Sequence, residues 1–405
     1  MSGLRVGAPA FDRLTSIMVP VVLIAASFAS VLSTDLYLPS LPYLPDYFAT
    51  DAKSVQLTMS LNLAGFALAQ LIHGPLSDRF GRRPILLVGM IGFLLATLAC
   101  AGAQSIGQLV VARTLQGAAA SAEAVLILAV IRDLYDDARA ARMLGLYGMT
   151  ISVAPAIGPL LGGYIFIWFG WRANFLLLSV VIAVITLLIW RFLSETVTPD
   201  REALHPRRLI LGYIGLLRKS EFMVYVILLS FSLAGLFAFV AGAPFVLIDR
   251  LGVRPQDYGY YQAMVVGAYF LGNLIASRLF DRIPAEWILR SSLVFMALGG
   301  GLLLLLLMLG IETPFALAGA MSFYGLGLAF IFVTAPVRAM ACAGTGGGMA
   351  SALLSSVEMG GGALGAASIN VFYDGTAYPM AVTVAFSGIA GLVIYEIWRF
   401  RRPIN

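Results

Sequence analysis

Residues 74–84 read Gly74-Pro-Leu-Ser-Asp78-Arg79-Phe-Gly81-Arg82-Arg83-Pro84, a run dense in charge within a chain that carries few charges. On both sides lie long apolar stretches, centred near Leu63 and Leu94. A stretch of roughly 20 apolar residues crosses the ~30 Å hydrocarbon core of a bilayer as one helix. The run is therefore predicted to be a tight loop that joins two membrane-spanning helices at one membrane surface.

The parts of this loop have separate physical roles. Gly74 and Gly81 allow helix ends to approach closely and to turn. Asp78 offers a carboxylate to helix N-termini and to arginines such as Arg132, while the arginines at 79, 82 and 83 hold the loop at an anionic surface. We predict that this charge cluster latches two helix bundles together in one state. The alternative is that the charges only set the topology.

Apolar stretches recur along the whole chain. Of its 405 residues 60% are hydrophobic and 12% charged, and the mean hydropathy is +0.91. Because soluble domains carry about 25% charged residues, most of this chain is expected to lie in lipid. The sequence predicts an all-α membrane protein with twelve transmembrane helices, the first of them broken at its far end by Pro39, Pro42 and Pro45. The stretches are centred near Leu23, Leu63, Leu94, Leu126, Ala154, Ile182, Ser232, Ala268, Leu303, Gly325, Gly360 and Gly388.

Basic residues are distributed unequally between the segments that join these stretches. If the N-terminus is cytoplasmic, the inside segments hold most of the 26 Lys and Arg residues, from Arg5 to Arg402. The outside segments hold only Lys53, Arg172, Arg250 and Arg254. Since basic residues concentrate on the cytoplasmic side, both termini are predicted to be cytoplasmic, in a bacterial inner membrane. This face explains the net charge of +5, and no nucleic-acid partner is expected.

A polar stretch, residues 194–221, divides the chain nearly in half. Six helices after Leu76-Ser-Asp-Arg-Phe80, the segment Leu279-Phe-Asp-Arg-Ile283 repeats the Leu-x-Asp-Arg pattern. Parallel repeats of this kind are typical of transporters in which two halves rock against each other. We predict a six-helix bundle over residues 1–194, a cytoplasmic linker over 195–220 and a second, pseudo-symmetric six-helix bundle over 221–405.

Several segments resemble those of a known family. Residues 74–84 resemble the loop signature of the major facilitator superfamily, and Arg113-Thr-Leu-Gln116-Gly117 is similar to its Arg-x-x-Gln-Gly element. Residues 154–163 are similar to the antiporter motif of drug:proton exporters. Residues 34–42, together with Ala243-Pro244-Phe245 and Tyr258-Gly-Tyr-Tyr261, resemble the bicyclomycin- and chloramphenicol-resistance (Bcr/CflA) branch. The resemblance covers essentially the whole chain and implies the major facilitator fold and a polyspecific exporter driven by inward proton flow.

Two transport functions fit these patterns. The first is proton-coupled efflux of lipophilic small molecules, such as phenicols, bicyclomycin or sulfonamides, by alternating access. The alternative is transport of a natural metabolite, such as a nucleoside, a sugar or an amino-acid derivative, with the same fold. The chain contains no Gly-x-x-x-x-Gly-Lys-[Ser/Thr] motif, so ATP is not expected to drive transport.

An enzyme within the membrane is not expected. Such an enzyme would need a paired nucleophile and base, or a metal cluster, at membrane depth, and the two histidines, His73 and His205, are too far apart to act together. Cys100 and Cys342 suggest neither a disulfide nor a metal site. We therefore expect no metal and no cofactor, with protons, a small molecule and the lipid bilayer as partners of a monomeric chain.

Four ionisable residues are predicted within the spans, where a charge costs ~2.5–3.5 kcal/mol even on the mildest scale. Asp35 lies near the outer end of the first span and Arg113 about seven residues into the fourth, so at 1.5 Å per residue they fall at a similar depth. An ion pair is feasible. Because burial disfavours an ionised carboxyl and a nearby cation favours it, movement of Arg113 relative to Asp35 would bind or release a proton. A static pair that fixes helix packing is the alternative.

The other two acids have less evident partners. Glu358 lies about ten residues into the eleventh span, near the midplane, and is predicted to be a second protonation site, a contact for a cationic substrate, or a protonated group bonded within the bundle. Glu123 lies roughly 80° around the fourth helix from Arg113, so we expect it to face another helix. Some members of the branch that this chain resembles carry a second acid on the first span. This chain has Ser27 at that position, which argues against two carboxylates on that helix.

The fifth stretch carries Pro155, Gly158, Pro159, Gly162 and Gly163 within ten residues. Each proline removes a backbone donor and bends a helix, and glycines permit tight packing against a neighbour. We predict a kinked helix beside the boundary between the halves that seals against proton leak. The alternative is that glycine and proline are simply common in membrane helices.

The wall of the substrate cavity is predicted to be aromatic with few polar groups, a composition that tolerates varied ligands. Each of these side chains could instead pack within the bundle or face lipid. The predicted lining residues are Phe231, Phe237, Tyr261, Tyr269 and Tyr324, with Asn62, Gln116 and Asn273 as polar contacts.

Overall fold

The computed structural model describes residues 13–200, 204–280, 282–344 and 347–401, and these residues are almost wholly helical. Arg5 and Asp281, which the sequence patterns above include, lie outside the described residues, as do the predicted bundle ends at residues 1 and 405.

The described helices follow one another in two long groups joined by one short helix. The first group comprises α1 (Arg13–Asp35), η1 (Leu38–Tyr43), α2 (Leu44–Phe48), α3 (Ala52–Phe80), α4 (Arg82–Gly102), α5 (Ile106–Leu134), α6 (Asp137–Phe169) and α7 (Trp171–Phe192). The joining helix is α8 (Pro206–Leu217). The second group comprises α9 (Ser220–Pro244), η2 (Phe245–Arg250), α10 (Tyr258–Leu279), α11 (Ala285–Met308), α12 (Pro314–Ala343), α13 (Gly347–Phe372) and α14 (Tyr378–Phe400).

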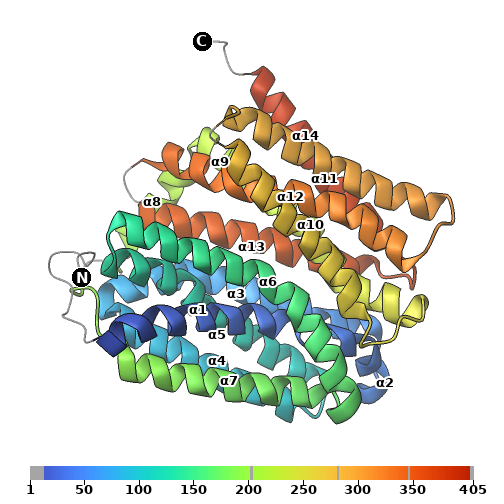
Figure 1. Ribbon diagram of the computed structural model, residues 1–405, viewed down its shortest axis with the longest axis horizontal. Helices are drawn as coiled ribbons and strands as arrows, with labels where there is room; N and C mark the ends of the chain where they lie inside the picture. The colour runs from blue at the N-terminus through green and yellow to red at the C-terminus, as the bar shows by residue number, and fades with distance from the viewer. Residues whose placement is uncertain (1–12, 201–203, 281, 345–346, 402–405) are drawn as a thin grey trace.

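The two groups lie side by side, α1–α7 in the lower part of Figure 1 and α9–α14 in the upper part. We name the two ends of the molecule by the short elements that they carry. The end with α8, where α1 begins and α14 ends, is the α8 end, and the end with η1, α2 and η2 is the η1 end (Figure 1). This arrangement agrees with the predicted two-half architecture, while the predicted boundaries at residues 194 and 220 stay a prediction.

The break in the first span is confirmed. α1 ends at Asp35. The chain continues as the 3-10 helix η1, which contains Pro39 and Pro42, and then as α2. Prolines lack the amide that an α-helix needs in its interior. The first span is therefore an α-helix up to Asp35 and changes to a 3-10 helix shortly after it.

Eleven helices of the described chain are long and apolar enough to cross a membrane. The twelfth long helix, α10, has 22 residues and packs between α6 and α12. Its tyrosines, with Gln262 and Asn273, lower its hydropathy. Leu271, Leu274 and Ile275 of α10 are nonetheless exposed, an apolar face that suits contact with lipid. With α10 the described long helices number the twelve that the sequence predicts.

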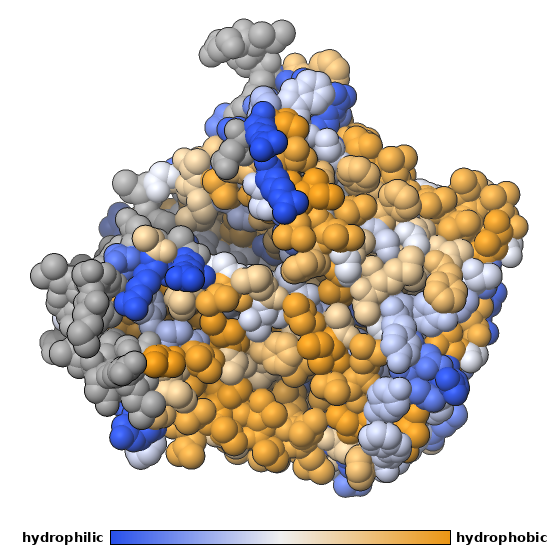
Figure 2. Space-filling view, in the orientation of Figure 1, coloured by the Kyte–Doolittle hydropathy of each residue, from blue (hydrophilic) through white to orange (hydrophobic). Residues whose placement is uncertain are grey.

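Apolar side chains cover the middle of the surface, and hydrophilic ones gather toward the two ends (Figure 2). Large apolar residues such as Leu68, Val88 and Trp168 are exposed. An exposed band of this kind is stable only against hydrocarbon. The distribution agrees with a chain that spans a membrane many times.

Side-chain caps begin several helices, and a glycine with a positive φ joins α3 to α4. Asp51, Ser105 and Asp136 each accept a hydrogen bond from a backbone amide in the first turn of α3, α5 and α6. The hydrogen bonds from Ser54 hold the pKa of Asp51 below its ordinary value. Gly81, with φ of +100°, is the only residue between α3 and α4, a conformation that favours glycine. The first predicted loop is thus as tight as the sequence indicates.

Two helix pairs form the boundary between the groups, here named the seam: α3 packs along α13, and α6 packs along α10. On the first pair, Ser356 donates a 2.7 Å hydrogen bond to the carbonyl of Ala67. Toward the η1 end, Gly259 lies so close to Leu160 that an added Cβ would be 2.6 Å from the Leu160 nitrogen. There η1 also contacts η2. Close backbone packing therefore closes the η1 end of the seam.

Candidate functional site

Asp35 lies at the seam, at the C-terminal end of α1, and is only 5% exposed. Gly158 of α6 packs directly against it, since a Cβ on Gly158 would lie 2.8 Å from the Cβ of Asp35. No hydrogen bond or ion pair of the Asp35 carboxyl is found among the described residues. A buried carboxyl without a bonded partner is costly when ionised, so this group is suited to gaining and losing a proton.

Arg113 is fully buried on α5, close to Asp35. Its Nη1 donates a 2.8 Å hydrogen bond to the carbonyl of Ser33 and a second bond to Oε1 of Gln116. Its guanidinium carbon lies 4.3 Å from the centre of the Tyr37 ring, a cation–π geometry. The feasible ion pair with Asp35 is not formed, because no nitrogen–oxygen distance between the two described side chains is within 4.0 Å, although their charges interact.

The ion pair is absent because Arg113 is held by other groups. Its Nε and Nη2 make no hydrogen bond among the described residues. These two donors are buried beside Asp35, and buried donors without partners are rare in stable proteins. The guanidinium therefore retains two donors that are available to the carboxyl if the two side chains approach each other.

A polar network fixes Arg113 from α3 and α4. The amide of Gln116 donates to Thr97 Oγ1 at 2.8 Å, and Thr97 in turn donates to the carbonyl of Phe93 at 2.6 Å. Asn62 donates to the backbone carbonyl of Arg113 at 2.7 Å. Gly117 allows this approach, because a Cβ there would collide with the backbone of Asn62. The Arg-x-x-Gln-Gly element thus uses its glutamine and its glycine to hold its arginine.

Glu123 faces α1 and α6 within the first group, as predicted from its helical angle. It is 3% exposed, and Oε2 accepts a 3.1 Å hydrogen bond from Ser27. Ser30 and Tyr147 lie beside the same carboxyl. Ser27 therefore contacts a buried acid on α5 at the place where a second acid on α1 would otherwise stand.

Glu358 is 7% exposed on α13, and the described residues provide it with no ion pair. Its charge interacts with Tyr269 of α10, which also lies beside Ser152 of α6 and Asn273. Asn273 is anchored through a 3.1 Å hydrogen bond to the carbonyl of Tyr269. The seam thus brings together an acid, a phenol and an amide that are distant in sequence.

The Pro/Gly segment of α6 lies at the seam as predicted. Pro155 and Pro159 are inside the helix. Gly162 lies against the backbone of Leu36, and Gly163 lies against the other half, where a Cβ would be 2.8 Å from the Cα of Gln256. Segment 158–163 of α6 therefore contacts α1 on one side and the start of α10 on the other. Its role as a seal against proton leak stays a prediction.

The charged loop is held within the first group. Arg82 pairs with Asp78 at 2.6 Å and with Asp133 at 3.2 Å. Arg132 is exposed, and no ion pair between it and Asp78 occurs among the described residues, so the expected partner of Asp78 is corrected to Arg82. Arg79 lies over the ring of Phe80, and Gly74 contacts Val125 loosely. A latch that spans both bundles stays a prediction for another conformation.

Sequence reasoning missed Glu195, which closes this loop from the linker. Its carboxylate accepts hydrogen bonds from the backbone amides of Arg82 at 2.8 Å and Arg83 at 3.2 Å, the first residues of α4. Arg83 also donates to the carbonyl of Trp190. A carboxylate at a helix N-terminus is favourable. The signal was available, because Gly81 has no side chain with which to cap α4.

The predicted lining residues divide into three kinds. Asn62 and Gln116 are occupied by the Arg113 network, and Tyr324 is fully buried, with its hydroxyl bonded to the carbonyl of Ser232 at 3.0 Å. Phe231, Phe237 and Tyr261 are half-buried and contact Phe386, Gly362 and Phe315 respectively. Tyr269 and Asn273 lie at the seam beside Glu358. Their contact with substrate stays a prediction.

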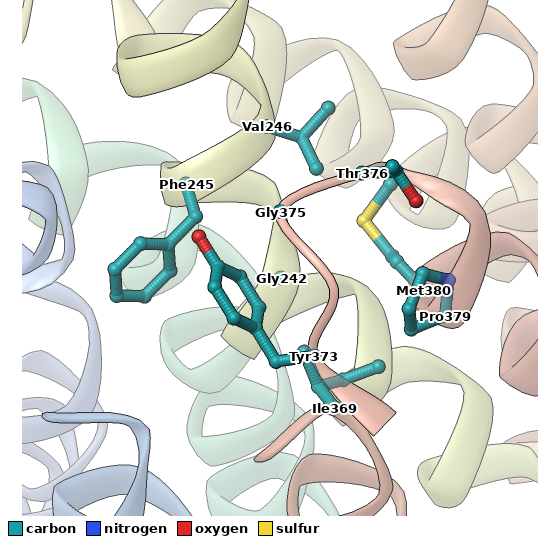
Figure 3. Close-up of a pocket in the computed structure, with 9 residues that line it drawn as sticks. All are labelled: Gly242, Phe245, Val246, Ile369, Tyr373, Gly375, Thr376, Pro379 and Met380. Atoms are coloured by element: carbon teal, nitrogen blue, oxygen red, sulfur yellow. The ribbon is translucent and has the colours of Figure 1, made fainter. Parts of the chain in front are cut away.

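Among the described residues, pockets occur at both ends of the molecule. The one in Figure 3 lies at the η1 end of the second group, between η2 and the chain after α13, and Phe245, Tyr373 and Met380 line it. The second is an open depression at the α8 end, lined by Asp78 and by residues of the linker and Met349 of α13. Neither contains Asp35, Arg113 or Glu358.

Comparisons with known proteins agree with this architecture. Over 95% of the chain the fold matches XylE, a xylose transporter from E. coli, with a TM-score of 0.72, 14% identity and 98% of that chain covered. A bicyclomycin resistance protein homolog from Haemophilus influenzae is 30% identical over 89% of this chain and 91% of its own. A chloramphenicol resistance protein from Pseudomonas aeruginosa is 29% identical over 87% of this chain and 83% of its own.

The model of one family matches nearly the whole sequence. The match to the Major Facilitator Superfamily extends over residues 23–403, from α1 to beyond the end of α14. With the relatives above, it confirms the resemblance of the chain to this family and to its Bcr/CflA branch. The chain is a multi-pass membrane transporter, not an enzyme, and belongs to the major facilitator superfamily.

Proposed function

We propose that this chain exports lipophilic small molecules in exchange for protons, by exposing a site at the seam alternately to the two sides of a bacterial inner membrane. The names of the two relatives, bicyclomycin and chloramphenicol resistance, support an antibiotic-like cargo. A seam that is closed at the η1 end supports a mechanism in which the halves rock about the bound substrate.

The α8 end is the cytoplasmic end in this proposal. It carries the arginine-rich loop between α3 and α4, the linker, the start of α1 and the end of α14, whereas the η1 end carries few basic residues. Cytoplasmic segments are enriched in Lys and Arg. With this orientation the closed η1 end faces the periplasm, and substrate enters from the cytoplasm.

The observation that carries the proposal is the unpaired Asp35 at the seam beside the spare donors of Arg113. When the donors approach, the cation favours the ionised carboxyl, and the proton leaves. When they withdraw, burial favours the neutral acid, and a proton is bound. A change in the packing of the halves therefore changes proton binding, which is the coupling that an antiporter requires.

Two further acids have different roles in this scheme. Glu123 is enclosed within the first group by Ser27 and Ser30, so we assign it a second, slower proton site. Glu358 lies beside Tyr269 and Asn273 across the seam, so we assign it to the substrate. A buried acid without a cationic partner attracts a cationic group of the ligand.

The energy available is sufficient. One proton that moves inward through the membrane potential supplies about 2.3 kcal/mol per 100 mV. Because about 1.4 kcal/mol corresponds to a tenfold ratio, one proton per molecule of a neutral substrate supports a gradient of about fiftyfold, and ATP is not required.

The test is transport by purified protein in proteoliposomes under an imposed pH gradient and membrane potential. Chloramphenicol and a lipophilic cation such as tetraphenylphosphonium should move against the proton flow and stop when ionophores collapse both gradients. Movement that continues without either gradient would contradict the proposal. Transport of nucleosides, sugars or amino-acid derivatives, with no movement of either drug, would favour the metabolite alternative.

A further inference from the structure

Two buried polar side chains near the start of α3 have no bonding partner. Gln56 is 1% exposed and Ser60 is 3% exposed. Among the described residues, neither the amide oxygen and nitrogen of Gln56 nor the hydroxyl of Ser60 makes a hydrogen bond. Buried polar groups are nearly always bonded, because the loss of water is costly otherwise. The scheme above gives neither residue a role, so their unpaired state calls for an explanation.

Two hydrogen bonds fix how α3 lies against α13 of the other half. Near the η1 end, the side-chain amide of Asn370 donates to the backbone carbonyl of Lys53. Farther along the seam, Ser356 donates to the carbonyl of Ala67 at 2.7 Å. The same number of residues separates the two bonds on each helix, so the helices run antiparallel and stay in contact between them.

Gln56 and Ser60 lie between these two bonds, on the face of α3 that meets α13. From Lys53 to Gln56, Ser60 and Ala67 the spacings are three, four and seven residues, which place residues on one side of an α-helix. Between Lys53 and Ala67 the helix contains no ionisable residue. The two unpaired side chains are therefore uncharged groups directed at the seam.

The facing stretch of α13 offers these side chains no partner. Between Ser356 and Asn370, at the same helical spacing, lie Gly360, Ala363 and Ala367. Their side chains contain no hydrogen-bonding atom, and a Cβ added to Gly360 would meet no atom within 4 Å. The seam thus has bonding capacity on α3 and small residues opposite it on α13.

We propose that Gln56 and Ser60 form a subsite that binds a neutral amide or hydroxyl group of the substrate when α3 and α13 separate at the η1 end. The Gln56 amide presents a donor and an acceptor side by side, and the Ser60 hydroxyl, one turn along, serves as either. A neutral group fits because this part of α3 carries no charge. The proposal rests on the proposed export function and names a chemical class of cargo for it.

The subsite is covered in this conformation, since both side chains are buried. In the proposed orientation the η1 end faces the periplasm, so the subsite acts after the seam opens there, on the release side. Chloramphenicol carries an amide and two hydroxyls and should use it. Tetraphenylphosphonium has neither a donor nor an acceptor, so its binding should depend on Glu358 and not on Gln56.

The test compares the affinities of these two molecules for purified full-length protein by isothermal titration calorimetry in detergent. Gln56→Met keeps an unbranched side chain of similar length and removes both bonding atoms. It should weaken chloramphenicol binding about threefold to tenfold, the effect of one hydrogen bond on an equilibrium constant. The affinity for tetraphenylphosphonium should not change. Gln104→Met, the same substitution at an exposed residue between α4 and α5, is the matched control and should bind both molecules as the unmodified protein does.

A cross-link at the contact between Lys53 and Asn370 tests whether binding needs the seam to open. In a Cys342→Ser background, the Lys53→Cys/Asn370→Cys protein should be held closed at the η1 end when it is oxidised. It should then bind chloramphenicol as weakly as Gln56→Met, and addition of Gln56→Met should weaken binding no further. Reduction should restore the difference. A loss caused by Gln56→Met that is equally large in the oxidised protein would contradict a subsite that opens with the seam.

Two other results would overturn the subsite. One is equal affinity of Gln56→Met and the unmodified protein for chloramphenicol. The other is an equal loss of affinity for both molecules, because a general change in packing affects both. Thermal unfolding without drug gives a separate check. Since Gln56 is unpaired in the closed seam, Gln56→Met should unfold at the same temperature or higher, and a lower temperature would show that Gln56 is bonded there.

These binding measurements need no proton gradient, so they separate the subsite from the proposed function. If the proteoliposomes show no proton-driven export, the proposed function fails, and the affinities still decide the role of Gln56. If export is driven by protons but Gln56→Met binds chloramphenicol as tightly as the unmodified protein, the subsite alone is wrong.

Discussion

The interiors of the two halves differ in how many ionisable side chains they bury. In the first, Arg113, Asp35 and Glu123 are all buried, and Ser27, Gln116 and backbone carbonyls surround them. In the second, the interior is mostly aliphatic and aromatic, and Glu358 is the buried acid among the described residues. Because a buried charge is costly, the concentration of buried ionisable residues in the first half favours a place for proton binding there. In our proposal the second half supplies contacts to the substrate and moves against the first.

The largest effect is expected when the first half loses its carboxyl at the seam. Asp35→Asn should reduce drug export to the level of membranes without the protein, because the amide binds no exchangeable proton. Drug uptake into everted membrane vesicles that are energised by respiration would measure this export. Asp374→Asn, at an exposed carboxyl that accepts hydrogen bonds from Thr376 in the loop before α14, is the matched control and should export normally. Export by Asp35→Asn against a gradient would remove Asp35 from the mechanism.

A methyl group at the seam should have the next largest effect. Gly163→Ala places a Cβ 2.8 Å from the Cα of Gln256, so the halves must separate at the η1 end. Overpacking of this kind costs about 1–3 kcal/mol, which corresponds to about a tenfold loss or more of the closed state. Gly148→Ala on the same helix meets open space and is the control. Initial rates of drug efflux compare them, and equal rates would show that the packing at Gly163 is not limiting.

The role of the second half is tested by cargo of different charge. Glu358→Gln should raise the KM for tetraphenylphosphonium about tenfold, the usual range for loss of one favourable charge contact. Chloramphenicol, which is neutral, should be exported with an unchanged KM. If both substrates lose export equally, Glu358 binds protons and the contrast between the halves is weaker than stated here.

The smallest effect is expected at the loop. Glu195→Ala leaves the amides of Arg82 and Arg83 without their acceptor. Loss of a helix cap costs about 1 kcal/mol, so thermal stability in detergent should fall by a few degrees and export only slightly. Glu195→Gln keeps an acceptor oxygen and should lose less. A complete loss of export in a stable Glu195→Ala protein would show that the loop gates transport.

The sequence predicted the architecture well because long apolar stretches have few other interpretations. The break after Asp35 and the tight turn at Gly81 followed from proline and glycine chemistry. The close approach of α6 to both halves at Gly158 and Gly163 likewise followed from small residues. These features depend on the backbone, which local sequence largely determines.

The site was predicted only in part, since partners come from distant helices. Depth placed Asp35 near Arg113, but depth gives no rotamer, and Arg113 turned out to be held by Ser33 and Gln116. The hydrogen bond between Ser27 and Glu123 joins positions 96 residues apart. No periodicity within one helix contains such information. Glu195, which caps α4 from 113 residues further along the chain, was missed for the same reason.

The most direct measurement is proton release when drug binds to purified protein in weakly buffered detergent. If Asp35 carries the proton, chloramphenicol should release protons in proportion to the drug bound, and Asp35→Asn should bind drug without releasing any. Glu358→Gln should release protons on binding chloramphenicol as the unmodified protein does. Proton release by Asp35→Asn equal to that of the unmodified protein would contradict the account.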